Sequence, residues 1–121
     1  MLNVENLDSV LTDVLTLPGA LATSIVDWKS GMVLASQNNG SFDIELASAG
    51  NAEVIKAKMA TMKSLKNEGS IEDILITLSD QIHIIRVLKD NPDLFIYLAL
   101  NSDKANLALA RNKLSSSESN L

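Results

Sequence analysis

The chain has 121 residues, enough for one domain with a substantial hydrophobic core. Its 15 acidic and 10 basic residues give a formal charge of −5, and the basic residues are scattered. This argues against a general nucleic-acid binder, because phosphate contacts need clustered Lys and Arg. With no cysteine, the chain has no disulfide framework, no thiolate metal site and no cysteine nucleophile.

The sequence shows no signal for membrane insertion. No segment approaches the ~18 continuous apolar residues of a membrane span. The first residues contain neither the basic start nor the apolar stretch of a secretion signal. We therefore expect a cytoplasmic protein that does not insert into membranes.

The first predicted elements are a helix and a hairpin. Apolar residues at three-and-four spacing predict the helix over residues 4–16, with Asn3 as its N-cap and Pro18-Gly19 as its end. Two β-rich runs then flank a turn at residues 27–31, which predicts two antiparallel strands within residues 17–37.

A long helix is predicted next, over residues 42–67, and closed by Glu68-Gly69-Ser70. At 1.5 Å per residue it would be ~37 Å long, against ~20 Å for a typical strand. We therefore expect this helix to overhang the sheet or to bend, with Gly50 as the favoured place for a bend.

Three β-rich segments follow at residues 71–78, 82–88 and 94–100. The turns between them are too short for crossover helices, so the segments form an antiparallel meander. The second and third segments are apolar at both alternations, which is typical of inner strands that are covered on both faces.

The last predicted helix is capped by Asn101-Ser102-Asp103 and runs to about Leu114, with Ala105, Ala108, Leu109 and Asn112 facing inward. Residues 115–121 are expected to form a flexible polar tail, so the predicted domain spans residues 1–114. This order of elements favours an α/β (α+β) fold in which three helices cover both faces of one sheet.

With this order of elements, the sequence resembles the roadblock family (the dynein light-chain roadblock domain, profilin-like), in its bacterial single-domain form. Three segments that together span nearly the whole chain carry the resemblance. They are the Pro18-Gly19-Ala20 entry with Val26-Asp27 and the run Gly31-Met32-Val33-Leu34-Ala35-Ser36, the Ala-rich helix from Ile44 to Met62, and the ending from Leu98 to Arg111.

The resemblance implies a five-stranded antiparallel sheet in the order 2-1-5-4-3, with the long helix on one face and the terminal helices on the other. It also implies a homodimer that joins the two third strands and pairs the two long helices. Members of the family usually act as non-enzymatic platforms for small Ras-like GTPases, or as subunits of motor and trafficking complexes.

The residues favour a dimer independently. The third strand would be an edge, yet residues 72–78 contain no Pro, no Lys and no central charge to protect it. The long helix has a patch of small residues that would let another chain approach closely, and Met59 and Met62 extend it with adaptable apolar surface. The patch comprises Ala47, Ser48, Ala49, Gly50 and Ala52. The alternatives are that the strand's own loops cover the edge, and that Ala and Met only build helix and core.

The predicted dimer interface combines the long helix with the third strand. It comprises Ile44, Ala47, Ser48, Ala52, Ile55, Met59, Met62, Ile74, Leu75 and Ile76.

No catalytic, cofactor-binding or metal-ligating residues are predicted. His83 is the single histidine and lies mid-strand, where a structural role is the usual one. The five glycines do not form a phosphate-binding loop, so any nucleotide would be bound by a partner. Neither Arg86 nor Arg111 falls on an exposed loop, so an arginine finger is not expected.

The leading hypothesis is therefore a non-enzymatic homodimeric scaffold for a small Ras-like GTPase, with regulation of that GTPase left open. The first alternative is a structural subunit of a larger motor, trafficking or signalling assembly without a GTPase partner. The second is a ligand-sensing or enzymatic domain with a pocket beside the sheet. The partner's identity, the pathway and further assembly of dimers are not defined by the sequence.

Overall fold

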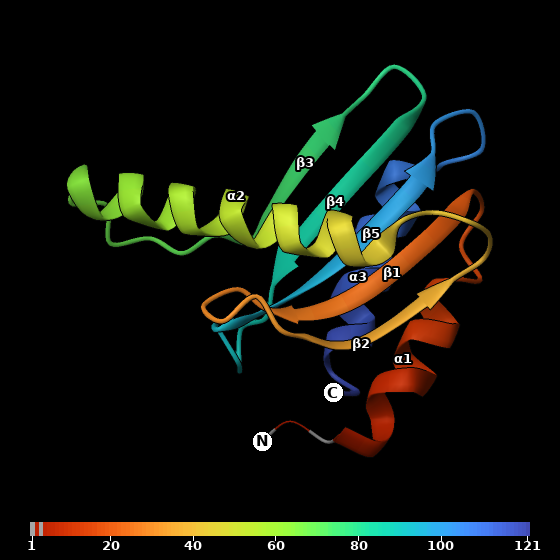
Figure 1. The fold of residues 1–121 in the computed structure, drawn as a ribbon, viewed down its shortest axis with the longest axis horizontal. Helices are drawn as coiled ribbons and strands as arrows, with labels where there is room; N and C mark the ends of the chain where they lie inside the picture. Colours follow the sequence, from red (N-terminus) through yellow and green to blue (C-terminus); the bar gives the residue numbers. More distant parts are fainter. Residues whose placement is uncertain (1, 3) are drawn as a thin grey trace.

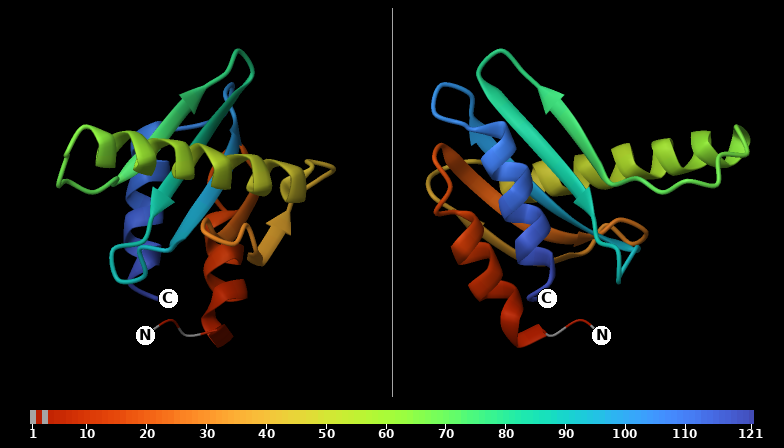
Figure 2. Two further views of the ribbon diagram at one scale, coloured as in Figure 1. Left: turned by 60° about the vertical axis from the view of Figure 1, so that its left-hand side comes forward. Right: turned by 180° about the vertical axis from the view of Figure 1, so that it is seen from behind.

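The computed structural model describes residue 2 and residues 4–121, and its core is a five-stranded antiparallel sheet in the order β2-β1-β5-β4-β3. Helix α2 crosses one face, while α1 and α3 cover the other (Figures 1 and 2). This confirms the expected fold class and strand order. The bounds are α1 Leu7–Val14, β1 Ala20–Asp27, β2 Val33–Asn38, α2 Ile44–Ser64, β3 Asp73–Thr77, β4 Gln81–Val87, β5 Leu94–Asn101 and α3 Leu107–Glu118.

Strand β5 is the centre of the molecule, because it pairs with β1 on one side and with β4 on the other. All its residues except Asn101 are buried. Alternation along the strand sends Leu98 into the core beneath α1 and α3, and Tyr97 into the core beneath α2. An inner strand covered on both faces was the expectation for this segment.

Helix α1 buries an apolar face formed by Leu7, Val10, Leu11 and Val14. It begins later than predicted, because Val4–Asn6 form a 3₁₀ turn; the predicted cap Asn3 lies outside the described residues. After the helix ends, Gly19 adopts a φ of +79°, and a Cβ there would lie 2.9 Å from the backbone oxygen of Asn101. Only glycine fits this position without strain.

The turn between β1 and β2 has a structural role. The Oδ1 atom of Asp27 accepts hydrogen bonds from the backbone N–H groups of Lys29 and Ser30, at 2.9 and 3.2 Å. The indole N–H of Trp28 donates to the backbone oxygen of Pro92 at 2.8 Å, which fastens this turn to the β4–β5 turn.

Helix α3 starts later and faces differently than predicted. Its N-cap is Asn106, whose side chain accepts from the Leu109 N–H, and not the segment 101–103. Asn101 instead belongs to β5 and its side chain accepts from the Asp103 N–H, which turns the chain before the helix begins. The buried residues of α3 are Ala110, Leu114 and Ser117, whereas Ala108, Leu109 and Asn112 are exposed.

The predicted polar tail is wrong over residues 115–118, which continue α3. One oxygen of Glu118 pairs with Arg86 Nε and the other accepts from the Lys89 N–H, both at 2.8 Å. Ser117 is also buried. These contacts with β4 and the turn that follows it hold the end of the helix, so the folded unit extends beyond the predicted boundary at residue 114.

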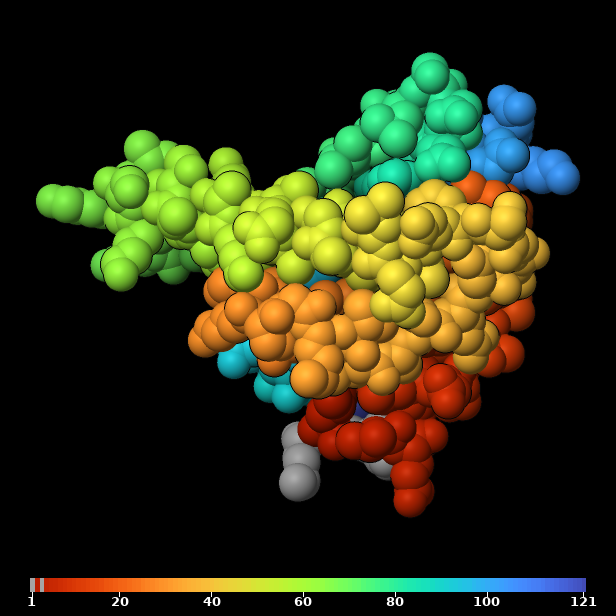
Figure 3. Space-filling model, viewed as in Figure 1, coloured from red at the N-terminus to blue at the C-terminus, as the bar shows by residue number. Residues whose placement is uncertain are grey.

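Helix α2 packs on the sheet mainly through its first half, with Met59 of the second half also packed against the core. Its buried residues end at Ile55, and the remaining turns project beyond the β3 side of the sheet (Figures 1 and 3). The buried half includes close polar packing, since the hydroxyls of Ser24 and Ser48 lie 2.8 Å apart. The expected overhang is therefore present.

Candidate interaction surface

The two edges of the sheet differ in protection. Strand β3 pairs with β4 in an unbroken register from Asp73 to Thr77. Strand β2 has a bulge, because its register against β1 shifts between Ile25 and Val26. Strand β2 also contacts α1, because the Gln37 side chain is hydrogen-bonded to that helix. A bulge and a covering helix are devices that block edge-to-edge pairing. Strand β3 has no such interruption and is the edge suited to pairing.

The three predicted interface residues on β3 lie on both faces of this edge. Ile74 and Ile76 are half-buried on the α2 side, where they pack against the core. Leu75 points to the opposite face and is 39% exposed. A partner strand paired along β3 would therefore meet apolar side chains on both faces.

Four of the predicted interface residues on α2 are not available to a partner. Ile44, Ser48, Ala52 and Ile55 are buried against the chain's own sheet, with no more than 7% of each residue exposed. The prediction is corrected here: this stripe holds α2 to the sheet. Another three predicted residues, Ala47, Met59 and Met62, are half-buried and remain accessible in part.

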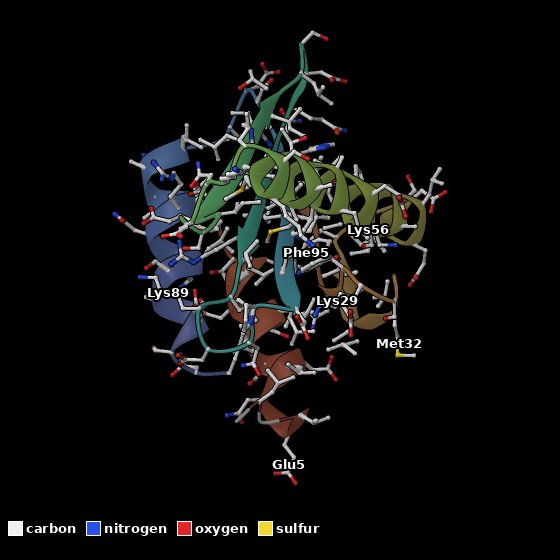
Figure 4. All side chains as sticks on the ribbon, turned by 90° about the vertical axis from the view of Figure 1, so that its left-hand side faces the viewer. Glu5, Lys29, Met32, Lys56, Lys89 and Phe95 are labelled. Atoms are coloured by element: carbon white, nitrogen blue, oxygen red, sulfur yellow. The ribbon has the colours of Figure 1, made fainter. Side chains whose placement is uncertain are left out.

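Two further exposed apolar residues were not among the predicted interface residues: Val54 of α2, at 36% exposure, and Leu65, the C-cap residue of α2, at 69%. They are three helical turns apart and lie on one side of the helix. Helix periodicity places Lys56 on the opposite side, which Figure 4 shows nearer to Lys29 and Met32 of the β1–β2 turn. Val54 and Leu65 therefore face the β3 edge.

Both arginines are held in ion pairs. Arg86 Nε lies 2.8 Å from Glu118 Oε1, and each of these side chains is 13% exposed. Arg111 Nε lies 2.8 Å from Oδ2 of Asp73, which ties α3 to the first residue of β3. A surface hollow of about 350 Å³ is lined by both arginines with Ala108, Asn112 and Ser115. Neither guanidinium is on a projecting loop.

His83 lies on the α2 side of β4 among aromatic rings. Its ring centroid is 5.4 Å from that of Tyr97 and 6.1 Å from that of Phe42, edge to face in both cases. Its Nε2 atom lies 2.8 Å from the Gln81 side-chain oxygen. Burial lowers the pKa of His83, with Asp80 opposing the shift, and burial raises the pKa of Tyr97 to about 12.

Within residue 2 and residues 4–121, no group of three or more His, Asp or Glu side chains is placed to hold a metal ion. In the same part of the chain, no helix combines the length and apolar character needed to cross a membrane.

This arrangement of sheet and helices is the Roadblock/LC7 fold. The Roadblock/LC7 domain from Streptomyces avermitilis matches with a TM-score of 0.80 at 8% identity, over 94% of this chain and 92% of that one. MglB from Myxococcus xanthus matches with a TM-score of 0.82 at 13% identity, over 98% and 88%. An MglB with a tetrameric arrangement matches with a TM-score of 0.79 at 18% identity, over 95% and 84%.

No family model and no curated protein sequence matches the chain. At these identities the structural likeness establishes the fold.

Proposed function

We propose that the chain is a non-enzymatic, cytoplasmic, homodimeric scaffold that binds a small Ras-like GTPase. The observation that carries the proposal is the uninterrupted β3 edge beside the overhanging half of α2, in a Roadblock/LC7 fold. The roadblock family, which the sequence resembles, usually provides platforms for such GTPases.

Antiparallel pairing of two β3 strands would join the sheets of two copies. The projecting half of α2 would then lie over the second copy's sheet, where Met59 and Met62 would meet half-buried apolar residues such as Ile74 and Ile76. Val54 and Leu65 face the same edge and would pack between the two α2 helices. A single two-fold arrangement would therefore cover both the unpaired β3 edge and the projecting half of α2.

The homodimer is tested by light scattering on a Leu65→Glu variant. Because Leu65 is 69% exposed in the single chain, the substitution should leave the fold intact while placing a charge in the proposed interface. We expect the mass to fall from dimer to monomer. Leu109→Glu is the matched control, since Leu109 is 46% exposed on α3 away from this surface. A wild-type chain that is monomeric at micromolar concentration contradicts the proposal.

The GTPase partner is tested by pull-down with a small Ras-like GTPase loaded with GTP or GDP. A scaffold that acts on the switch regions should retain one nucleotide state preferentially. Both arginines are engaged in ion pairs, so Arg86→Ala and Arg111→Ala should each leave any stimulation of hydrolysis in place. Loss of stimulation with intact binding in either variant would show that an arginine finger operates.

A structural subunit of a larger assembly is the second candidate, favoured by the tetrameric arrangement of one similar MglB. In that case the dimer would form, but no GTPase would be retained in either nucleotide state.

A further inference from the structure

One exposed side of α2 has charges in an order that is complementary to itself. Residues at three-and-four spacing line this side, which we call the charged face: Glu45, Ala49, Glu53, Lys56, Ala60 and Lys63. The acidic residues occupy the first half of the helix and the basic residues occupy the second. All six are exposed except Lys56, which is partly exposed.

Contacts within the helix account for only part of this pattern. Lys56 Nζ lies 3.2 Å from Glu53 Oε1, one turn away. Glu45 and Lys63 have no opposite charge three or four residues away along the helix. Glu45 near the N-terminus and Lys63 near the C-terminus both interact favourably with the helix dipole, which stabilises a single helix. The dipole does not explain why these charges lie on the same side of the helix as Ala49 and Ala60.

The order of charges is antisymmetric about the middle of the helix: each acidic position in the first half has a basic position at a similar distance in the second half. When two copies of this face are laid antiparallel, Glu45 of each copy falls opposite Lys63 of the other, and Glu53 falls opposite Lys56. Ala49 then falls opposite Ala60, and these small side chains leave room for the backbones to approach. A parallel arrangement would place like charges opposite one another at every charged position.

We propose that the charged face of α2 binds the charged face of a second copy in antiparallel orientation. The face lies on the side of α2 that carries Lys56, away from the β3 edge (Figure 4). In Figure 3, α2 runs in yellow and green across the front of the molecule. The contact is thus separate from β3 pairing and would join dimers into larger assemblies.

The test compares wild type with two charge-reversed variants by sedimentation velocity, over a range of protein concentrations at low and high salt. One variant combines Glu45→Lys with Glu53→Lys, and the other combines Lys56→Glu with Lys63→Glu. We expect wild type to exceed the dimer at low salt and to return to the dimer at 0.5 M NaCl, roughly the regime in which exposed charge pairs are screened. Each variant alone should lose the larger species.

A 1:1 mixture of the two variants should restore the larger species, because every opposed pair then has opposite charges. The helix dipole alone predicts no such rescue. Controls reproduce the change in net charge at exposed residues elsewhere, and should assemble as wild type. They are Asp90→Lys with Asp103→Lys, and Lys89→Glu with Lys104→Glu.

The outcomes separate this contact from the proposed dimer. A wild-type chain that stops at the dimer under all conditions overturns the inference and leaves the β3 homodimer standing. The same holds if the larger species persists in both charge-reversed variants. If charge reversal instead abolishes the dimer while Leu65→Glu preserves it, the charged face is the dimer interface and β3 pairing is wrong.

Discussion

Two glycines with the same backbone conformation have different surroundings. Gly19 and Gly31 both have a φ of +79°. A Cβ on Gly19 would lie 2.9 Å from the Asn101 oxygen and 3.3 Å from the Ala105 nitrogen, both backbone atoms. A Cβ on Gly31 would have no neighbouring atom within 4 Å. The first glycine is required by conformation and by space, the second by conformation alone.

These surroundings predict an ordered pair of stability losses on substitution by alanine. Gly31→Ala should cost about 1 kcal/mol, the strain of a left-handed non-glycine residue. Gly19→Ala should cost at least about twice that, because the backbone of residues 101–105 must also move. Urea denaturation of both variants measures the difference. Equal losses would show that the contact with the end of β5 relaxes freely.

At the scale of single elements, the strands were predictable because alternation and short turns are local signals. The packing direction of α2 was not, because the helix is rich in alanine and has two apolar stripes at similar spacing. One contains Ile44, Ser48, Ala52 and Ile55, and the other contains Ala47, Val54 and Leu65. Only contact with the sheet decides which stripe is core, so the predicted interface included the four residues of the buried stripe and omitted Val54 and Leu65.

The end of α3 was missed for a related reason. Residues 115–119 are polar and include four serines, which in isolation indicate a frayed terminus. Their order comes from Glu118, which bonds to Arg86, 32 positions earlier in the chain. A contact between residues so far apart in the sequence cannot be predicted from the pattern of neighbouring residues.

Two ion pairs in different settings should respond differently to loss of the carboxylate. Glu118→Ala removes both hydrogen bonds that hold the end of α3, and leaves Arg86, 13% exposed, without its partner. We expect a loss of about 2–3 kcal/mol in unfolding free energy. Glu53→Ala removes a pair whose carboxylate side chain is 72% exposed, and should cost no more than about 0.5 kcal/mol. Thermal denaturation of the two variants compares them directly.

At the scale of the whole molecule, the strand order came from resemblance to a family, because the residues of single strands do not state which strands are neighbours. Composition and length limited the answer to one compact domain. The proposed dimer and the proposed GTPase partner involve other chains, and could not be read from the pattern of a single one; in this chain β3 is an unpaired edge and the second half of α2 projects beyond the sheet.

Because β5 is the last strand in sequence but lies at the centre of the sheet, the other four strands cannot form one sheet without it. The strand begins at Leu94, yet it separates β1 from β4 and contributes to both cores. A nascent chain that ends before Leu94 can form the β1–β2 and β3–β4 hairpins, but nothing joins them into a sheet. We expect a chain truncated after Asp93 to lack cooperative unfolding and to be digested rapidly by protease, whereas one truncated after Ser119 should resist. The β1–β2 hairpin can therefore join the β3–β4 hairpin in one sheet only when β5 is present.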